Sequence, residues 1–160
     1  MDSSAPTLAE IVPLIITGGA CLLGLGMIDR GSGRSTAVRW PTIALLFVAS
    51  MAHVPVIPAH LAEAPYMGVL FIAFATAAFA LAALMAARPS AVLYPPAGLL
   101  CGAAILAYVA TRLVAFPQLA DDVGNWTEPL GVVSVTAEAG VVVLSVIGLR
   151  RSGWISATRN

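Results

Sequence analysis

The sequence predicts an all-α integral membrane protein, a single domain of residues 1–160 built from about five transmembrane helices. Three observations support this prediction: long apolar stretches, few charged residues, and a regular placement of the arginines. Of the 160 residues, 59% are hydrophobic and 10% are charged, and the mean hydropathy is +0.94. A water-soluble domain of this size cannot bury so much apolar surface in one core, so a lipid bilayer is the solvent that suits it.

Five apolar stretches are each long enough to cross a hydrocarbon core of ~30 Å at ~1.5 Å per residue. The predicted spans are residues 8–28, 40–57, 65–87, 94–116 and 130–149. The first follows an amino terminus without a basic residue, so we interpret it as a retained span and not as a signal peptide. The second begins at Trp40 and Pro41, and Pro55 and Pro58 are expected to kink or end it.

The other spans are defined by their first residues and by their small side chains. The third begins at Pro65, where a missing amide proton is harmless, and its alanine-rich second half predicts a central position. The fourth carries Gly98 and Gly102, and the fifth, after Pro129, carries Gly140. Small residues let helix backbones approach closely, and we expect packing within one chain more than dimerisation.

The arginines predict the orientation of the helices. They follow the first, third and fifth apolar stretches, at Arg30, Arg34, Arg39, Arg88, Arg150, Arg151 and Arg159. Residues 58–64 and 117–129 contain neither arginine nor lysine. Because short cytoplasmic connectors retain these bases, the amino terminus is predicted outside and the carboxyl terminus inside.

Charge and composition also bear on partners and location. The formal net charge is zero, and the bases are too few and scattered for a nucleic-acid partner. The predicted partner is the lipid bilayer, with other membrane subunits as a further option. Every one of the 8 basic residues is arginine, and small residues and proline are abundant. That usage is typical of GC-rich bacterial genomes, so the predicted location is the bacterial plasma (inner) membrane.

Ionisable side chains inside the apolar stretches are the candidate functional residues, because a bilayer tolerates them mainly where they pair, face a cavity or carry function. These residues are His53, Arg112 and Glu138, with His60 and Glu63 at the membrane edge. The predicted topology places all of them in the outer half of the bundle. We therefore expect a polar pocket that opens outward.

His53, His60 and Glu63 form the densest group, and we interpret them as candidate metal ligands. Two imidazoles and a carboxylate are a partial ligand set for copper, zinc or iron, so a transition metal (copper or zinc) or haem is the predicted cofactor. If the segment were one helix, offsets of seven and ten residues would place the three on one stripe. The alternatives are hydrogen bonding of each imidazole to a carbonyl or lipid headgroup, and pH sensing.

Arg112 and Glu138 form the other predicted polar site. Arg112 either extends to the outer headgroups or pairs with Glu138, Asp121 or Asp122. Glu138 has no short route to water. We interpret it as the partner of Arg112, as part of an anionic-ligand site, or as a proton-relay carboxylate.

Three motifs occur in order along the chain: His53…His60-Leu-Ala-Glu63-Ala-Pro-Tyr-Met-Gly68, Thr111-Arg112-Leu-Val-Ala-Phe-Pro117, and Glu128-Pro129-Leu-Gly131 followed by Glu138. In this order the chain resembles a group of small, uncharacterised bacterial polytopic membrane proteins, over roughly residues 45–140. Members of that group tend to carry a glutamine in the third span, where this chain has only Thr76. The resemblance implies a common fold and a shared site on His53, His60, Glu63, Arg112 and Glu138, without a settled activity.

Three functions are compatible with this sequence. The favoured one is a membrane protein with a metal- or haem-binding site in the outer half of the bundle. The others are an accessory or assembly subunit of a larger membrane complex and a small proton-coupled transporter centred on Glu138; the lack of a visible inverted repeat argues mildly against the transporter. Known catalytic signatures are absent, so no catalytic residue is predicted, and an enzyme would need a metal or a borrowed cofactor.

Overall fold

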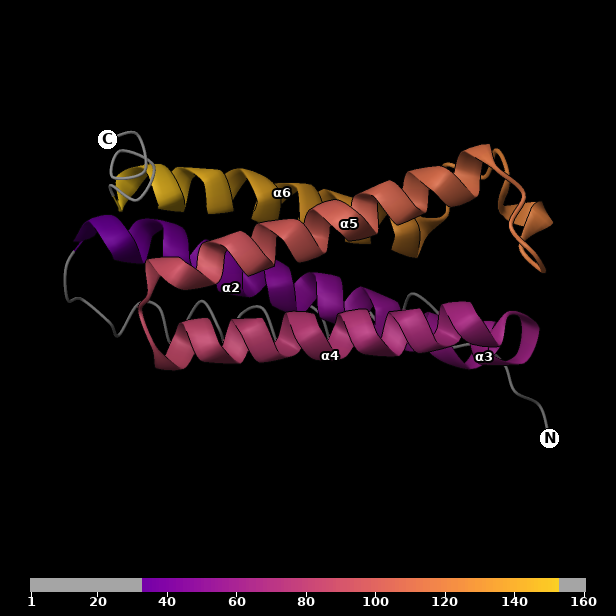
Figure 1. The fold of residues 1–160 in the computed structure, drawn as a ribbon, viewed down its shortest axis with the longest axis horizontal. Coiled ribbons are helices and arrows are strands. Elements are labelled where there is room, and N and C mark those ends of the chain that lie inside the picture. Colours follow the sequence, from indigo (N-terminus) through magenta and orange to yellow (C-terminus); the bar gives the residue numbers. More distant parts are fainter. Residues whose placement is uncertain (1–32, 153–160) are drawn as a thin grey trace.

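The computed structural model describes residues 33–152, with side chains from residue 37 onward, so the predicted first span at 8–28 lies outside the described residues. The elements are α2 (Gly33–His53), η1 (Val54–Val56), α3 (Ile57–Glu63), α4 (Pro65–Ala87), η2 (Ala91–Leu93), α5 (Tyr94–Leu113), η3 (Ala120–Asp122) and α6 (Pro129–Arg151). Consecutive long helices run in opposite directions (Figure 1). Within the described part of the chain the fold is thus all-helical, as predicted.

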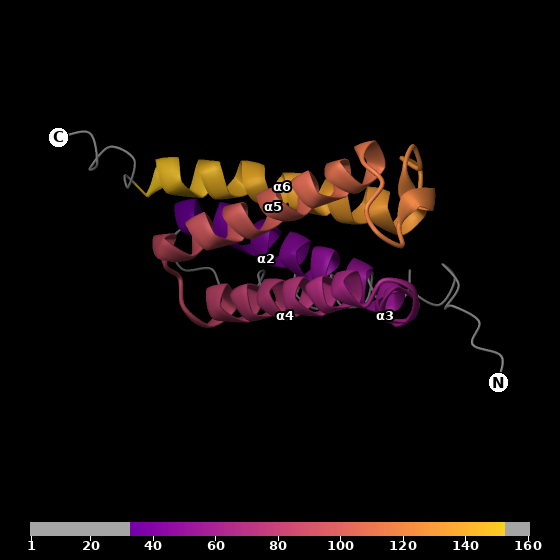
Figure 2. The same cartoon turned by 45° about the vertical axis from the view of Figure 1, so that its right-hand side comes forward.

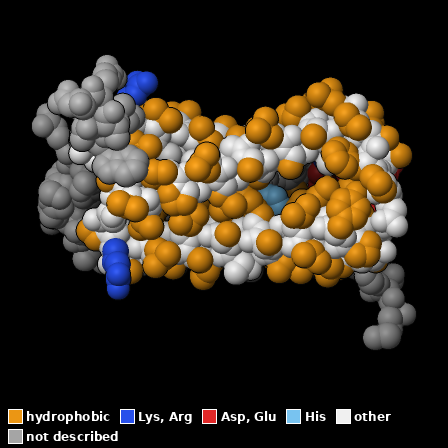
Figure 3. All heavy atoms as spheres, viewed as in Figure 1, with side chains coloured by type: hydrophobic (Ala, Val, Ile, Leu, Met, Phe, Trp, Pro, Cys, Tyr) orange, Lys and Arg blue, Asp and Glu red, His pale blue; other side chains and the backbone are white. Residues whose placement is uncertain are grey.

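Four segments of the described residues are long and apolar enough to cross a membrane: Ala37–Glu63, Pro65–Ala87, Ala91–Leu113 and Pro129–Arg151. Large apolar side chains point outward from them, with Leu99 75% exposed and Leu106 71% exposed. Apolar side chains accordingly cover the face shown in Figure 3. Since such a surface is solvated by lipid and not by water, the chain has the build of a multi-pass membrane protein.

The two prolines after His53 break the second span, as the sequence predicts. Pro55 lies in η1 and Pro58 in the first turn of α3, where neither can donate to the helical hydrogen-bond ladder. Figure 2 shows α3 almost end-on while α2 and α4 run across the view. By contrast, Pro41 lies inside α2 and not at its start, because the helix begins seven residues before Trp40, at Gly33.

Among the described helices, α2 makes contacts with both sides of the bundle. α2 packs against both α4 and α6, and α5 packs mainly against α6, whereas α4 and α5 touch each other little (Figures 1 and 2). The prediction that the third span is central is therefore wrong for the described residues. Its alanines bury one face only, at Ala75, Ala78 and Ala82, and α2 takes the central place.

Glycines bring the helices into contact at particular points. A Cβ added to Gly140 of α6 would lie 2.5 Å from Leu45 of α2, and one added to Gly98 of α5 would lie 3.2 Å from Ser145 of α6. Around Gly102 there is open space. The predicted close packing thus holds at Gly98 and Gly140 but not at Gly102.

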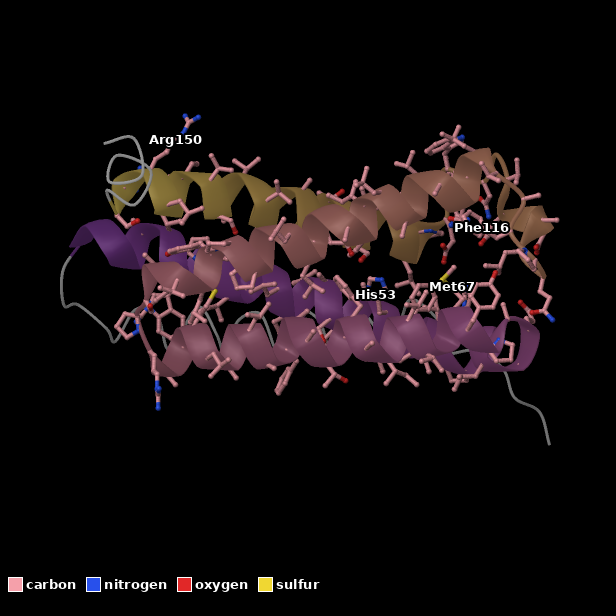
Figure 4. All side chains as sticks on the ribbon, in the orientation of Figure 1. His53, Met67, Phe116 and Arg150 are labelled. Carbon is pink, nitrogen blue, oxygen red and sulfur yellow. The ribbon has the colours of Figure 1, made fainter. Side chains whose placement is uncertain are left out.

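The connector between α5 and α6 folds back over one end of the bundle. α5 ends at Leu113, earlier than predicted, and a tight turn follows in which the amide of Leu119 donates to the carbonyl of Phe116 at 3.0 Å. Leu119 is buried against Ala64 and Met67, and Phe116 and Met67 lie at the same end of the bundle (Figure 4). The connector between α5 and α6 therefore packs against the start of α4.

Candidate functional site

A hydrogen-bonded chain of three side chains links α2 to α6 inside the bundle. Nδ1 of His53 lies 2.9 Å from the carbonyl oxygen of Ala49 and 3.3 Å from Oγ of Ser134. The hydroxyl of Ser134 donates to Oε1 of Glu138 at 2.7 Å. Since a carbonyl oxygen can only accept, the hydrogen of the ring is on Nδ1. This one hydrogen is shared between the Ala49 carbonyl, which is closer, and Oγ of Ser134, and Ser134 donates in turn to Glu138.

The far end of this chain is enclosed. Glu138 is 1% exposed and Ser134 is 6% exposed, and Glu138 lies about 13 Å along α6 from Pro129 at ~1.5 Å per residue. Its neighbours Ala137 and Val141 belong to the main apolar core. Neither of the ion pairs found among the described residues includes Glu138. A carboxyl group in such surroundings is costly to keep, which marks it as a functional candidate.

The near end of the chain is accessible. The His53 side chain lies at the base of a hollow between α4 and α5, where its ring is visible from outside (Figures 3 and 4). The ring is held between the phenyl groups of Phe74 and Phe71, at centroid distances of 4.4 Å and 5.1 Å. Because both hydrogen bonds of the imidazole use Nδ1, Nε2 is the ring nitrogen left for exchange with the hollow.

Arg112 lies in a different polar cluster, at the end of α5. Its guanidinium pairs with Asp122 at 2.6 Å and with Glu128 at 3.3 Å, and it lies over the ring of Tyr108 at 4.6 Å. The predicted pair between Arg112 and Glu138 is therefore wrong, and the alternative partner Asp122 is the one found. The reason is geometric: the connector returns over the end of α5 and places the carboxylates of Asp122 and Glu128 next to Arg112. Arg112 thereby fixes the connector.

The three predicted metal ligands do not converge. Nδ1 of His60 lies 2.9 Å from the carbonyl oxygen of Val56, and Glu63 is exposed at the end of α3. The rings of His60 and His53 both contact Phe71, that of His60 at a centroid distance of 4.7 Å. The proline break turns α3 away from α2, so the single stripe expected from helical spacing does not form.

Within residues 33–152, no group of three or more His, Cys, Asp or Glu side chains is placed to hold a metal ion. His53, His60 and Glu63 thus do not form the predicted three-ligand metal site, and the predicted haem stays a prediction. What the structure joins instead is His53 with Glu138, two residues of the predicted polar pocket that were expected in different groups within it.

Ser134, the residue that joins them, was not singled out from the sequence. The available signal was its position four residues before Glu138 on the same helix, a spacing at which side chains meet. A lone serine in an apolar helix is common, so this spacing gains meaning only once α2 brings His53 against it.

Comparison with protein-family models, with curated proteins and with solved structures finds no match for this chain. The resemblance described from the motifs therefore stays a prediction. Function has to be argued from the geometry of the site.

Proposed function

We propose that this membrane protein transfers protons through its bundle, with Glu138 as the carboxyl group that binds the transferred proton. The hydrogen-bonded chain from His53 through Ser134 to Glu138 is the observation that supports this function. Imidazole, hydroxyl and carboxyl groups are the side chains that relay protons inside membranes. The chain also joins an accessible group to an enclosed one, which a relay requires.

Each step of the relay moves one proton by one hydrogen bond. A proton from the hollow binds Nε2 of His53, and the ring then releases its Nδ1 proton to Oγ of Ser134. Ser134 in turn releases its own hydroxyl proton to the carboxylate of Glu138. At the end Glu138 holds one more proton, Ser134 is again a neutral hydroxyl, and His53 is neutral with its hydrogen on Nε2.

The carbonyl of Ala49 favours the return of His53 to its starting tautomer after each transfer. Once Nδ1 has lost its hydrogen, it faces the Ala49 oxygen at 2.9 Å as one acceptor facing another. Because two acceptors cannot hydrogen-bond to each other, the original tautomer is favoured again. The ring returns to that tautomer when water in the hollow supplies a proton to Nδ1 and accepts the one on Nε2, because a proton taken from Ser134 would reverse the transfer.

The two other functions considered from the sequence have less support in this geometry. A metal or haem site would need ligands that converge, and His53, His60 and Glu63 do not. An accessory subunit of a larger complex needs no buried chain of polar groups. Both become outcomes of the experiment below.

Proton flux into liposomes tests the proposal. The purified full chain is reconstituted with a pH-sensitive dye inside, and a potassium diffusion potential drives protons inward. We expect Glu138→Gln to abolish the flux, since an amide cannot bind the transferred proton. Ser134→Ala should lower the flux about tenfold or more, since it removes a hydrogen bond of ~1.5 kcal/mol from the relay. Ser134→Thr keeps a hydroxyl and should keep the flux.

Thr136→Ala is the matched control for these variants. Thr136 lies on α6 between the two relay residues, is exposed, and bonds only to the carbonyl of Val132 in its own helix. Wild-type flux no higher than in empty liposomes would overturn the proposal. Stoichiometric metal in the purified protein that is lost in His53→Ala would replace it with metal binding, and a co-purified subunit with no flux would replace it with an accessory role.

The orientation predicted from the arginines is also part of the proposal: amino terminus outside and carboxyl terminus inside, in a bacterial inner membrane. It places the end of the bundle that carries His53 and the connector between α5 and α6 toward the exterior. Asn125→Cys should react with a membrane-impermeant maleimide on intact cells, and Ser152→Cys only after the cells are opened. Both variants are made in a Cys21→Ser background, and that background is the blank, since its remaining cysteine, Cys101, is buried. The opposite labelling pattern would reverse the direction of transfer.

A further inference from the structure

A cavity of about 230 Å³ lies at the end of the bundle opposite the connector between α5 and α6. Three arginines from separate segments line it: Arg39 of α2, Arg88 just after α4, and Arg151 at the end of α6. Tyr94, Ser90 and Ser152 belong to the same lining, and the hydroxyl of Ser152 donates to the carbonyl of Leu149 at 2.8 Å. None of the described residues that line the cavity is Asp or Glu. The cavity is therefore basic and rich in hydrogen-bond donors.

The arginines differ in how freely they can move. Arg39 is 7% exposed, and its guanidinium lies over the ring of Trp40 at 5.1 Å, so this cation has a fixed place. Arg88 and Arg151 are exposed and can adjust to a ligand. The ring of Tyr94 lies directly on Gly148, where an added Cβ would come within 2.7 Å of it. The part of the wall formed by these two residues is therefore closely packed.

We propose that this cavity binds the phosphate group of an anionic phospholipid. Guanidinium groups match the oxygens of a phosphate in pairs, and hydroxyl donors complete its hydrogen bonds. The cavity is smaller than the ~300–1,000 Å³ typical of sites for larger small molecules, which suits a headgroup. This inference is independent of the proposed proton transfer, since it uses none of the relay residues.

The position of the cavity favours a lipid over free phosphate. Its arginines lie where the membrane-spanning segments begin or end, near Ala37, Ala87 and Arg151. Val38, Met85 and Ala91 add apolar lining to the same cavity, which suits the acyl end of a lipid while the phosphate stays among the arginines. Basic pockets between helix ends at the cytoplasmic surface recognise anionic headgroups in this way.

Arg150 provides a matched control. It is exposed and lies next to Arg151 on α6, yet it does not line the cavity and points away from the bundle (Figure 4). Arg88→Gln and Arg150→Gln each remove one positive charge from the same end of the protein. Only the first removes a charge from the cavity.

Lipid titration of the full chain in a neutral detergent tests the proposal, with the thermal unfolding temperature as the readout. We expect phosphatidylglycerol to raise this temperature, and phosphatidylcholine and inorganic phosphate not to. Arg88→Gln should weaken the apparent affinity for phosphatidylglycerol about fivefold, while Arg150→Gln leaves it unchanged.

Three results would overturn the proposal. Equal loss of affinity in Arg88→Gln and Arg150→Gln would mean diffuse attraction to the basic end. Equal stabilisation by phosphatidylcholine would remove the role of headgroup charge. Stabilisation by inorganic phosphate at the same concentration would assign the cavity to a soluble anion.

Discussion

Nδ1 of His53 and Oγ of Ser134 lie 3.3 Å apart across the interface of α2 and α6. His53 is the last residue of α2, and Ser134 lies in the second turn of α6. The contact is therefore made at the end of α2, immediately before the segment that contains Pro55. The same contact connects a half-buried ring to a carboxyl group that is 1% exposed. One hydrogen bond thus joins the hollow to the interior of the bundle.

Replacing Arg112 should release the connector between α5 and α6. Arg112→Met removes the guanidinium and with it both ion pairs, so Asp122 and Glu128 lose their cation. We expect this change to lower the free energy of unfolding by ~2 kcal/mol. Limited proteolysis in detergent should then cut between residues 114 and 128 faster than in the wild type. Arg150→Met, an exposed arginine outside this cluster, is the control. Equal cutting rates in both variants would contradict the anchoring role.

Ser145→Ala should make the protein more stable. Oγ of Ser145 is buried and has no hydrogen-bond partner among the described residues, and an unsatisfied buried hydroxyl costs ~1 kcal/mol or more. The expected result is a higher unfolding temperature in detergent together with unchanged proton flux.

Ser134→Ala provides the comparison for this prediction. It removes a serine whose hydroxyl is used by Glu138 at 2.7 Å, so it should lower the unfolding temperature. If Ser145→Ala were as destabilising as Ser134→Ala, an unseen partner of Ser145 would have to exist.

Gly140→Ala should separate α2 from α6, whereas Gly102→Ala should be tolerated. The new methyl group at position 140 would come within 2.5 Å of Leu45, while the one at position 102 meets open space. Overpacking of this kind costs ~1–3 kcal/mol. Since α6 carries the relay, Gly140→Ala should also reduce proton flux. Comparable unfolding temperatures for the two variants would show that Leu45 can move aside.

The sequence is sufficient to predict the four spans of the described residues, because each depends on local composition alone. It also identifies His53, Arg112 and Glu138, since an ionisable residue in an apolar stretch is visible without knowing its neighbours. The sequence could not show which side chains these three residues contact. The pairing depends on how far α3 turns at Pro55 and on where the connector places Asp122 and Glu128, and both are set by tertiary contacts.

Gln118→Gly should stabilise the turn that closes over the end of the bundle. Gln118 has a φ of 66° and follows Pro117, in a turn closed by the 3.0 Å bond from the Leu119 amide to the Phe116 carbonyl. A type II turn has this geometry and favours glycine at that position. Glycine relieves a backbone strain of ~1 kcal/mol, and its greater freedom when unfolded offsets part of that gain.

The turn is held on α4 by a second bond, from the hydroxyl of Tyr66 to the carbonyl of Pro117 at 2.7 Å. Tyr66→Phe removes this bond without changing the strain at Gln118, so it should speed proteolysis of the connector, whereas Gln118→Gly should slow it. Because the two changes act on the same turn through different atoms, their opposite directions separate backbone strain from docking. If Gln118→Gly speeds proteolysis instead, chain flexibility outweighs the strain and the turn is held by its contacts alone.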